Sequence, residues 1–121
     1  MVENQTSINA DRKDLYNLLG SIHPELKTTV DAVVSCTYVD GALEKKMKYL
    51  LALAVALGTG CRMCILAQLT SALESGATIE EVKDVLSVVF AMKGTSGIAE
   101  SLRIIQYLHE LDEFDEKNVG N

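Results

Sequence analysis

The stretch that decides the fold is YLLALAVALGTGCRMC, residues 49–64. From Tyr49 to Leu57 every residue is apolar or aromatic. A helix that is apolar on all sides must be covered by other helices or by another subunit. We expect this central helix to cover residues 43–57. The glycine-bearing residues 58–60 should break it, and the next helix should begin at about Cys61.

Further helices are predicted from apolar residues that recur with the spacing of a helix face. Pro24 fits the first turn of a helix, Gly76 fits a helix end, and Thr78 with Glu81 forms a capping box. The expected helices cover residues 11–22, 24–40, 43–57, 61–75, 78–93 and 96–111. Their expected buried faces include Leu15, Leu18, Leu19 and Ile22; Leu26, Val30, Val33 and Val34; Ile65, Leu69, Ala72 and Leu73; and Val82, Val85, Leu86, Val89 and Phe90.

Composition supports a single all-α domain. The chain has 121 residues, of which 48% are hydrophobic and 23% are charged, with one proline and no tryptophan. A chain of this length can bury a core without disulfide staples, and few breakers and aromatics favour a bundle of about six helices. We expect one domain over residues 1–121, in which the polar, acidic residues 112–121 form a flexible tail.

The net charge of −6 excludes two classes of partner. Binding to nucleic acid or to an anionic membrane surface needs clustered lysine and arginine, so we expect neither. The N-terminal residues show no signal-peptide pattern, and the apolar run is far shorter than the ~20 residues that span a bilayer. The expected location is the cytoplasm.

Candidate chemistry concentrates at Cys61 and Cys64. This C-x-x-C places two thiols one turn apart where a helix begins. The free N–H groups and positive end of the helix favour thiolate over thiol, and Arg62 adds a cation. In such a setting a thiol pKa of ~8.5 can fall to between ~3.5 and ~7.5. One thiolate can then attack a disulfide or peroxide, and the other can resolve the intermediate.

Two other interpretations of the pair stay open. Cysteine is among the most buried residue types, so both residues could simply fill the core. Zinc needs four ligands, of which the pair supplies two, and His23 and His109 lie far away in the sequence. We therefore expect no metal and no cofactor. Cys36, the third cysteine, is expected to be a buried structural thiol.

Two residues outside the pair are candidates for supporting roles. Gln68 lies one turn beyond Cys64 on an otherwise apolar face, where a buried amide needs partners. It could bond near the thiol, or it could be satisfied by backbone groups or face a subunit boundary. Tyr49 could point its hydroxyl toward the pair, which helical spacing alone does not decide.

Several segments occur in the order typical of a known family: Gly41–Leu50, Leu53–Leu57, Gly60 and Cys61, Cys64, and Gly76–Val82. Over about residues 20–110 the chain resembles the carboxymuconolactone decarboxylase family, and most of all its alkylhydroperoxidase D-like branch. The ordered combination is far more specific than the C-x-x-C alone.

The resemblance implies an all-helical subunit that forms homotrimers or homohexamers, with the cysteine pair near a subunit interface. It implies reduction of a hydroperoxide or disulfide substrate, followed by re-reduction by an external dithiol. In the family the second cysteine, here Cys64, is taken as the attacking thiol and the first, here Cys61, as its resolving partner and proton donor. Helix-dipole reasoning alone slightly favours Cys61 as the nucleophile.

The chain departs from the family at two positions. The redox branch carries a glutamate twelve residues before the first cysteine and a histidine four after the second, where this chain has Tyr49 and Gln68. Neither serves as a general base near neutral pH, because glutamine does not titrate and the pKa of tyrosine is about 10. Glu44 lies five residues before Tyr49 and about 140° around the helix, so it does not replace the missing glutamate.

The leading hypothesis is a thiol–disulfide oxidoreductase or weak hydroperoxide reductase, an antioxidant activity of the peroxiredoxin type. The alternative is a non-catalytic oligomeric scaffold or small-molecule binding protein that kept the fold and lost the proton relay. The decarboxylase activity that names the family is less favoured, because the sequence shows no cluster of histidine and arginine for a lactone acid.

Overall fold

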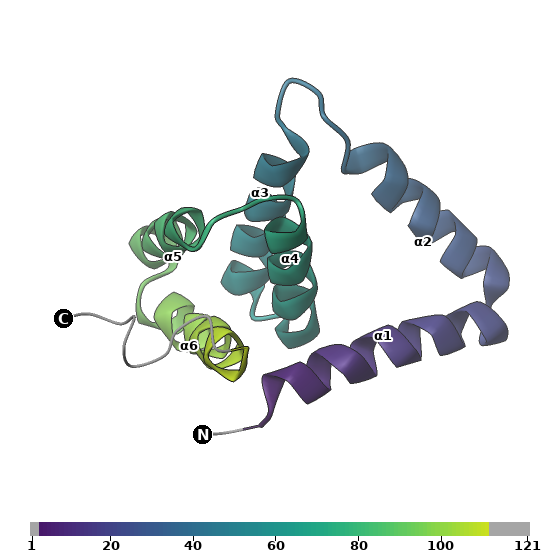
Figure 1. The fold of residues 1–121 in the computed structure, drawn as a ribbon, viewed down its shortest axis with the longest axis horizontal. Helices are drawn as coiled ribbons and strands as arrows, with labels where there is room; N and C mark the ends of the chain where they lie inside the picture. The colour runs from purple at the N-terminus through teal and green to yellow at the C-terminus, as the bar shows by residue number, and fades with distance from the viewer. Residues whose placement is uncertain (1–2, 112–121) are drawn as a thin grey trace.

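A computed structural model describes residues 3–111 of the chain. Over this range the chain folds into helices joined by short turns, without a strand (Figure 1). The helices are α1 (Gln5–Ile22), α2 (Pro24–Thr37), α3 (Lys45–Thr59), α4 (Arg62–Glu74), α5 (Ile79–Lys93) and α6 (Thr95–Glu110). The predicted all-α class and six helices are confirmed. The predicted tail over residues 112–121 lies outside the described residues, and the single domain stays a prediction.

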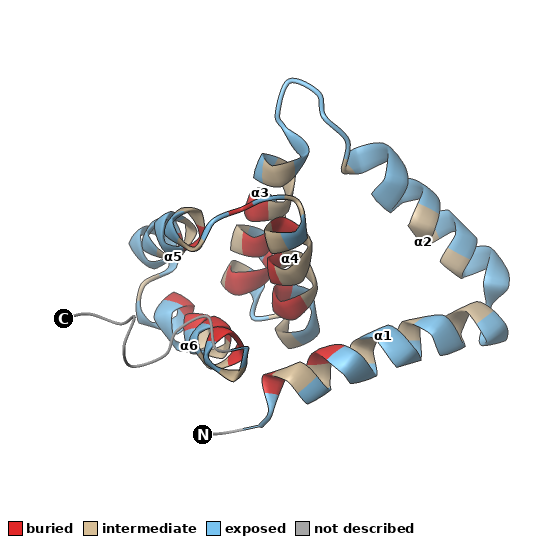
Figure 2. Ribbon diagram, viewed as in Figure 1, coloured by how far each residue is buried: buried red, intermediate tan, exposed pale blue. Residues whose placement is uncertain are grey.

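The core lies where α3 and α4 pack against each other, with α5 and α6 covering this pair (Figure 1). Buried residues concentrate on α3, α4 and α6 (Figure 2). The largest fully buried apolar side chains are Leu53, Leu57, Ile65, Leu66, Leu69, Val82, Ile104 and Leu108. Burying one leucine or isoleucine side chain contributes about 1.5–3 kcal/mol, so this cluster drives folding.

The most apolar helix, α3, is buried on one side only. On its other side Leu51 and Val55 are 48% and 66% exposed. Leu51 borders a groove of about 320 Å³ between α3 and α5, whose apolar walls also carry the carboxylates of Glu81 and Asp84. Apolar as it is, α3 is too short to cross a membrane, and none of the other described helices is long and apolar enough to do so.

The predicted capping box fixes the start of α5. The Thr78 hydroxyl accepts a hydrogen bond from the Glu81 N–H at 3.1 Å, and the Glu81 carboxylate accepts one from the Thr78 N–H at 2.9 Å. This backbone hydrogen bond and the Lys46 ammonium lower the pKa of Glu81. The predicted stop at Gly76 is also confirmed, since its φ of +95° is a left-handed conformation that glycine adopts without strain.

The first helix begins two turns earlier than predicted, at Gln5 instead of Asp11. Asn4 caps it, because its side-chain oxygen accepts a hydrogen bond from the Ser7 N–H at 2.8 Å. The first turns of α1 are mostly polar, so a search for apolar periodicity could not detect them.

Polar contacts dock α1 on the last turn of α6. The Glu110 carboxylate accepts hydrogen bonds from the N–H groups of Gln5 and Thr6, at 2.9 and 2.7 Å, and from the Gln106 amide at 2.9 Å. Burial would raise the pKa of Glu110, but these hydrogen bonds outweigh it and lower that pKa. The buried residues of α1 are accordingly Gln5 and Asn9, which are polar.

The predicted buried faces of the first two helices are wrong for the single chain. Leu15, Leu18 and Ile22 of α1 and Leu26, Val33 and Val34 of α2 are between 43% and 73% exposed. Along its length α2 packs against α1, it contacts α3 only at its C-terminal end, and it has no buried residue (Figure 2). We call α1 and α2 together the arm. Its apolar residues face outward because none of the other helices within residues 3–111 covers them.

Two single-residue predictions fail in the same way. Cys36, near the end of α2, is exposed and free instead of buried. Phe90 of α5 is 50% exposed. Periodicity identifies the apolar side of a helix, but it does not show whether another part of the same chain covers that side.

Candidate functional site

The cysteine pair lies at the turn that joins α3 to α4. Contrary to the prediction, α3 continues through Gly58 and Thr59, because the residue that ends it is Gly60, with φ +73°. The Cys61 N–H then donates to the Ala56 carbonyl at 3.1 Å, which folds the turn back against α3. Cys61 is thereby placed as the N-cap of α4.

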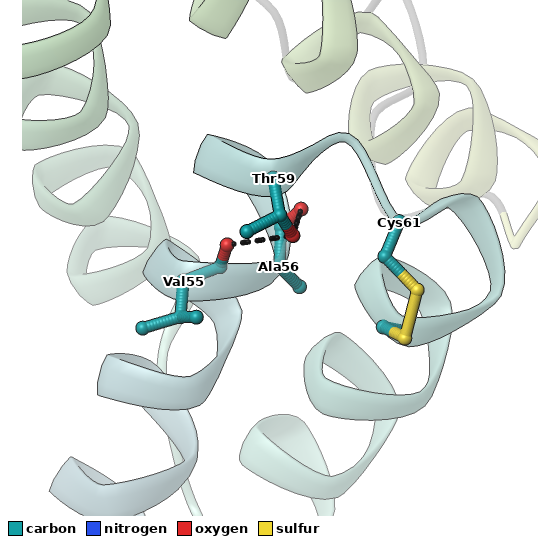
Figure 3. The surroundings of a disulfide bond; sticks show 5 residues. Val55, Ala56, Thr59 and Cys61 are labelled. Carbon is teal, nitrogen blue, oxygen red and sulfur yellow. Dashed lines mark hydrogen bonds between the residues drawn. A yellow bond between two sulfur atoms is a disulfide. The ribbon is translucent and has the colours of Figure 1, made fainter.

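Cys61 and Cys64 are joined by a disulfide at the start of α4 (Figure 3). Their Cα atoms are 5.1 Å apart, and the sulfurs are 1.99 Å apart. The structure therefore brings together the two residues that the sequence singled out, at the predicted helix start.

The two cysteines differ in how far each residue is exposed. Cys64 is exposed, whereas Cys61 is half-buried. The first intrahelical hydrogen bond of α4 runs from the Ile65 N–H to the Cys61 carbonyl, at 2.8 Å, and no side chain caps the helix. The preceding N–H groups of the first turn have no acceptor within the helix, so they point the positive end of its dipole at the pair.

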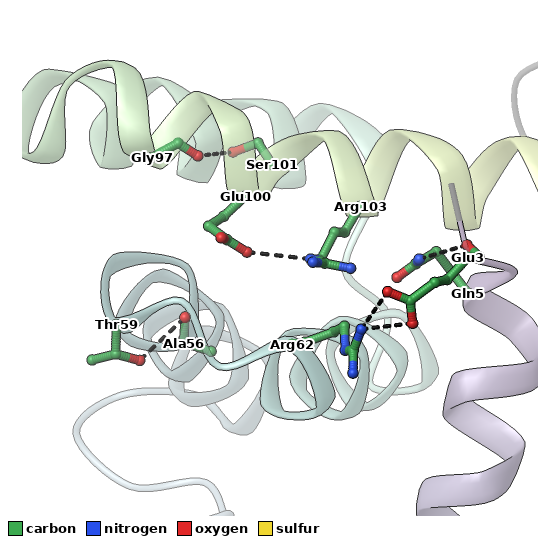
Figure 4. Close-up of polar contacts among 9 residues, drawn as sticks. All are labelled: Glu3, Gln5, Ala56, Thr59, Arg62, Gly97, Glu100, Ser101 and Arg103. Carbon is green, nitrogen blue, oxygen red and sulfur yellow. Dashed lines mark hydrogen bonds and ion pairs between the residues drawn. The ribbon is translucent and has the colours of Figure 1, made fainter. Parts of the chain in front are cut away.

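Arg62, between the two cysteines, turns away toward the start of α1. Its Nη1 lies 2.5 and 2.6 Å from the two carboxylate oxygens of Glu3 (Figure 4). This ion pair neutralises the guanidinium and links the arm to the first turn of α4. The electrostatic support that the sequence suggested for a thiolate is therefore shared with Glu3.

Gln68 and Tyr49 occupy the positions where the family has its proton relay. Oε1 of Gln68 is buried and has no hydrogen-bond partner among the described residues. The Tyr49 ring stacks on Tyr38, with ring centroids 4.1 Å apart and planes 1° apart, which ties the end of α2 to α3. Their predicted support of the cysteines stays a prediction.

A charged pair on α6 was missed by the sequence analysis. Glu100 and Arg103 lie beside the α3–α4 turn, and the Arg103 Nε donates to the Glu100 carboxylate at 3.3 Å (Figure 4). A Cβ atom built on Gly60 would lie 3.8 Å from Oε1 of Glu100. Only the i, i+3 spacing of the pair was visible in the sequence, and that spacing does not reveal its tertiary neighbour.

No group of three or more histidine, cysteine, aspartate or glutamate side chains within residues 3–111 is arranged to hold a metal ion. At the turn the structure places the two sulfurs, with the charged side chains of Arg62, Glu100 and Arg103 nearby (Figure 4). This arrangement suits two-electron exchange between a dithiol and a disulfide.

Comparison with known sequences gives consistent matches. The model of the carboxymuconolactone decarboxylase family matches residues 24–107. Uncharacterized protein 4 in the cox locus of Paracoccus denitrificans is 33% identical over 81 residues, which cover 67% of this chain and 73% of that protein. An uncharacterized protein of Cupriavidus necator is 29% identical over 97 residues, covering 80% of this chain and 86% of its own length.

Solved structures share the fold over nearly their whole length. A carboxymuconolactone decarboxylase family protein from Legionella pneumophila, crystallised in its apo form, superposes with a TM-score of 0.81 at 26% identity, covering 88% of this chain and 95% of that one. A family protein from Thermotoga maritima, possibly involved in the antioxidative response, has a TM-score of 0.75 at 28% identity. The match covers 93% of this chain and 94% of that one.

Two alanine substitutions test whether Gly60 defines the turn. Gly60→Ala places a Cβ on a left-handed residue, so we expect it to lower the free energy of unfolding by about 1–2 kcal/mol. Gly58→Ala is the matched control, because Gly58 is helical with open space around it. It should raise stability by about 0.5–1 kcal/mol. Denaturant unfolding at equal protein concentration measures the free energy of unfolding of both variants. A Gly60→Ala protein as stable as the wild type would contradict the role of Gly60 in defining the turn.

Proposed function

The chain belongs to the carboxymuconolactone decarboxylase family, and on that premise we propose that it is a thiol–disulfide oxidoreductase or weak hydroperoxide reductase. The observation that carries the proposal is the Cys61–Cys64 disulfide at the start of α4, with Cys64 exposed. An exposed sulfur at a helix N-terminus is where a substrate can meet a stabilised thiolate. The possible antioxidative role of the Thermotoga relative agrees with this class of activity.

In the proposed cycle with a hydroperoxide, the Cys64 thiolate attacks one peroxide oxygen. An S–O bond forms, the O–O bond breaks, and the released alkoxide takes up a proton to leave as an alcohol. The Cys61 sulfur then attacks the Cys64 sulfur, so that the S–S bond forms and the S–O bond breaks. The Cys61 thiol proton leaves with the hydroxide as water. Two electrons have passed from the dithiol to the peroxide.

A disulfide substrate follows the same route through a mixed disulfide with Cys64, and both of its halves leave as thiols. An external dithiol restores the reduced pair in either case. No metal or organic cofactor takes part in this cycle. A reducing compartment such as the cytoplasm supplies the dithiol, and we place the protein there as part of the proposal.

We assign the attack to Cys64 because it is the more exposed residue of the pair and because the family resemblance implies this order. Tyr49 and Gln68 stand where the resemblance implies a glutamate and a histidine, so that relay has no counterpart at these positions. Thiolate formation then relies on the helix N-terminus, which favours a modest peroxidase rate.

We further propose that the arm is covered by other copies of this chain, in the homotrimer or homohexamer that the family resemblance implies. The support is the apolar surface of α1 and α2, which the single chain leaves exposed. A contiguous apolar surface of this kind is typical of protein interfaces and is unusual on a monomer.

Sedimentation velocity tests the assembly. We expect a mass several times that of the chain, and Val33→Asp, which places a charge on the exposed apolar face of α2, should shift it toward the monomer. Ser35→Asp is the control, because it adds the same charge about 200° away around the helix. A monomeric wild-type protein would refute the assembly.

Single substitutions of each cysteine test the function in peroxide and disulfide reduction assays. Cys64→Ser should reduce the rate to that of the buffer. Cys61→Ser should react once and stop at a sulfenic acid or mixed disulfide on Cys64, which mass spectrometry detects. Cys36→Ser is the control and should keep the wild-type rate, because Cys36 lies on the arm and is not part of the disulfide.

Full activity in both Cys61→Ser and Cys64→Ser would refute the proposal. An inactive wild-type protein whose pair can be labelled only after unfolding would favour the alternative, a scaffold or small-molecule binding protein. The apolar groove between α3 and α5 is the observation that supports that alternative. Release of carbon dioxide from a lactone acid would instead favour the decarboxylase reaction.

A further inference from the structure

Glu100 stands where the turn that carries the cysteines meets α6. Its carboxylate lies beside Gly60, the residue that precedes Cys61. A Cβ atom built on Gly60 would lie 3.8 Å from Oε1 of Glu100. Figure 4 shows the side chains of Glu100 and Arg103 projecting from α6 toward this turn. Cys61, which follows Gly60 in the chain, is the half-buried residue of the pair.

The Glu100–Arg103 pair is not explained by stability alone. Its side chains are only 31% and 26% exposed, and an ion pair with i, i+3 spacing on a helix stabilises the helix only weakly. Nη1 of Arg103 is buried without a hydrogen-bond partner in the described range, as is Oε1 of Gln5 at the start of α1. Incompletely satisfied polar groups at a helix interface carry a desolvation cost, which a functional role would account for.

Resting on the function proposed above, we propose that Glu100 is the proton acceptor for Cys61, and that Arg103 positions it. The positions that the resemblance assigns to the relay hold Tyr49 and Gln68, and Glu100 supplies a carboxylate from a different helix. This carboxylate serves the second chemical step, in which Cys61 closes the disulfide, whereas the helix N-terminus serves the attack by Cys64.

The step balances without a further reactant. The Cys61 thiol proton passes to the Glu100 carboxylate as the Cys61 sulfur attacks the Cys64 sulfur. The S–S bond forms, the bond from Cys64 to the leaving group breaks, and the leaving group takes its electron pair. The leaving hydroxide or thiolate then recovers the proton from Glu100. When an external dithiol reopens the disulfide, the Cys61 thiolate leaves and takes up a proton by the same route in reverse.

The other polar side chains drawn at this turn do not offer this function. Arg103 on α6 is a cation paired with Glu100 itself, and Arg62 on α4 is paired with Glu3. From α3, the Thr59 hydroxyl donates to the carbonyl oxygens of its own helix (Figure 3). Glu100 is the carboxylate that α6 places beside Gly60, the residue before Cys61.

Single-turnover kinetics test this assignment in the Cys36→Ser background, which removes the exposed third thiol. The reduced protein is mixed with hydrogen peroxide or with a small aromatic disulfide, quenched at intervals with an alkylating reagent, and analysed by mass spectrometry. The Cys64 adduct reports the first step, and the intramolecular disulfide reports the second.

In Glu100→Gln we expect the first step to be unchanged and the second to be at least about tenfold slower at neutral pH. In this variant the rate of the second step should rise about tenfold for each pH unit, because hydroxide must remove the Cys61 thiol proton. The rate of the second step in the wild-type protein should depend less steeply on pH. Glu100→Asp, which keeps the carboxylate, should recover part of the rate and of the wild-type profile.

Glu80→Gln is the matched control, since Glu80 forms an i, i+3 pair with Lys83 on the exposed face of α5. It should behave as the wild type in both steps. A Glu100→Gln protein with the wild-type rate and pH profile, or with both steps slowed equally, would overturn the role of Glu100 alone. A wild-type protein that forms neither adduct nor disulfide would overturn the proposed function and this inference together.

Discussion

The left-handed turn at Gly60 is the constraint on which the rest of the structure depends. It ends α3 and directs the Cys61 N–H back to α3, so that α4 starts at the N-cap residue Cys61. The same turn sets α4 antiparallel to α3, which allows Leu53, Leu57, Ile65 and Leu69 to form one buried cluster. The position of the cysteine pair and the packing of the core therefore follow from one backbone conformation.

Local patterns in the sequence correctly predicted those features of the fold that depend only on residues close together in the chain. The capping box of α5, the stop at Gly76 and the cysteine pair at a helix start were all predicted correctly, because each is set within a few positions. The polar start of α1, the exposure of Cys36 and the approach of Glu100 to the turn could not be predicted, because they depend on which helix packs where. The exposure of the apolar side of the arm could not be predicted either, because periodicity identifies an apolar side of a helix but not what covers it.

The site combines a familiar pair with an altered surrounding. Tyr49 packs on Tyr38 and Gln68 keeps a buried oxygen without a described partner, so neither position holds the base that the resemblance would imply. Around Cys61 the charges come instead from α6 and from the segment before α1. In the proposed division of labour the exposed Cys64 meets the substrate, and the half-buried Cys61 closes the disulfide with the Glu100 carboxylate as proton acceptor.

The most direct test of a reactive thiolate at the start of α4 is the rate of iodoacetamide labelling of the reduced protein as a function of pH, with each cysteine assigned by mass spectrometry. Cys36 provides an internal reference, because it is exposed and free on another helix. The account predicts that Cys64 labels with an apparent pKa well below ~8.5 and faster than Cys36 at neutral pH. If Cys64 labels no faster than Cys36, or only after the protein unfolds, the helix start does not activate the thiol and the redox assignment fails.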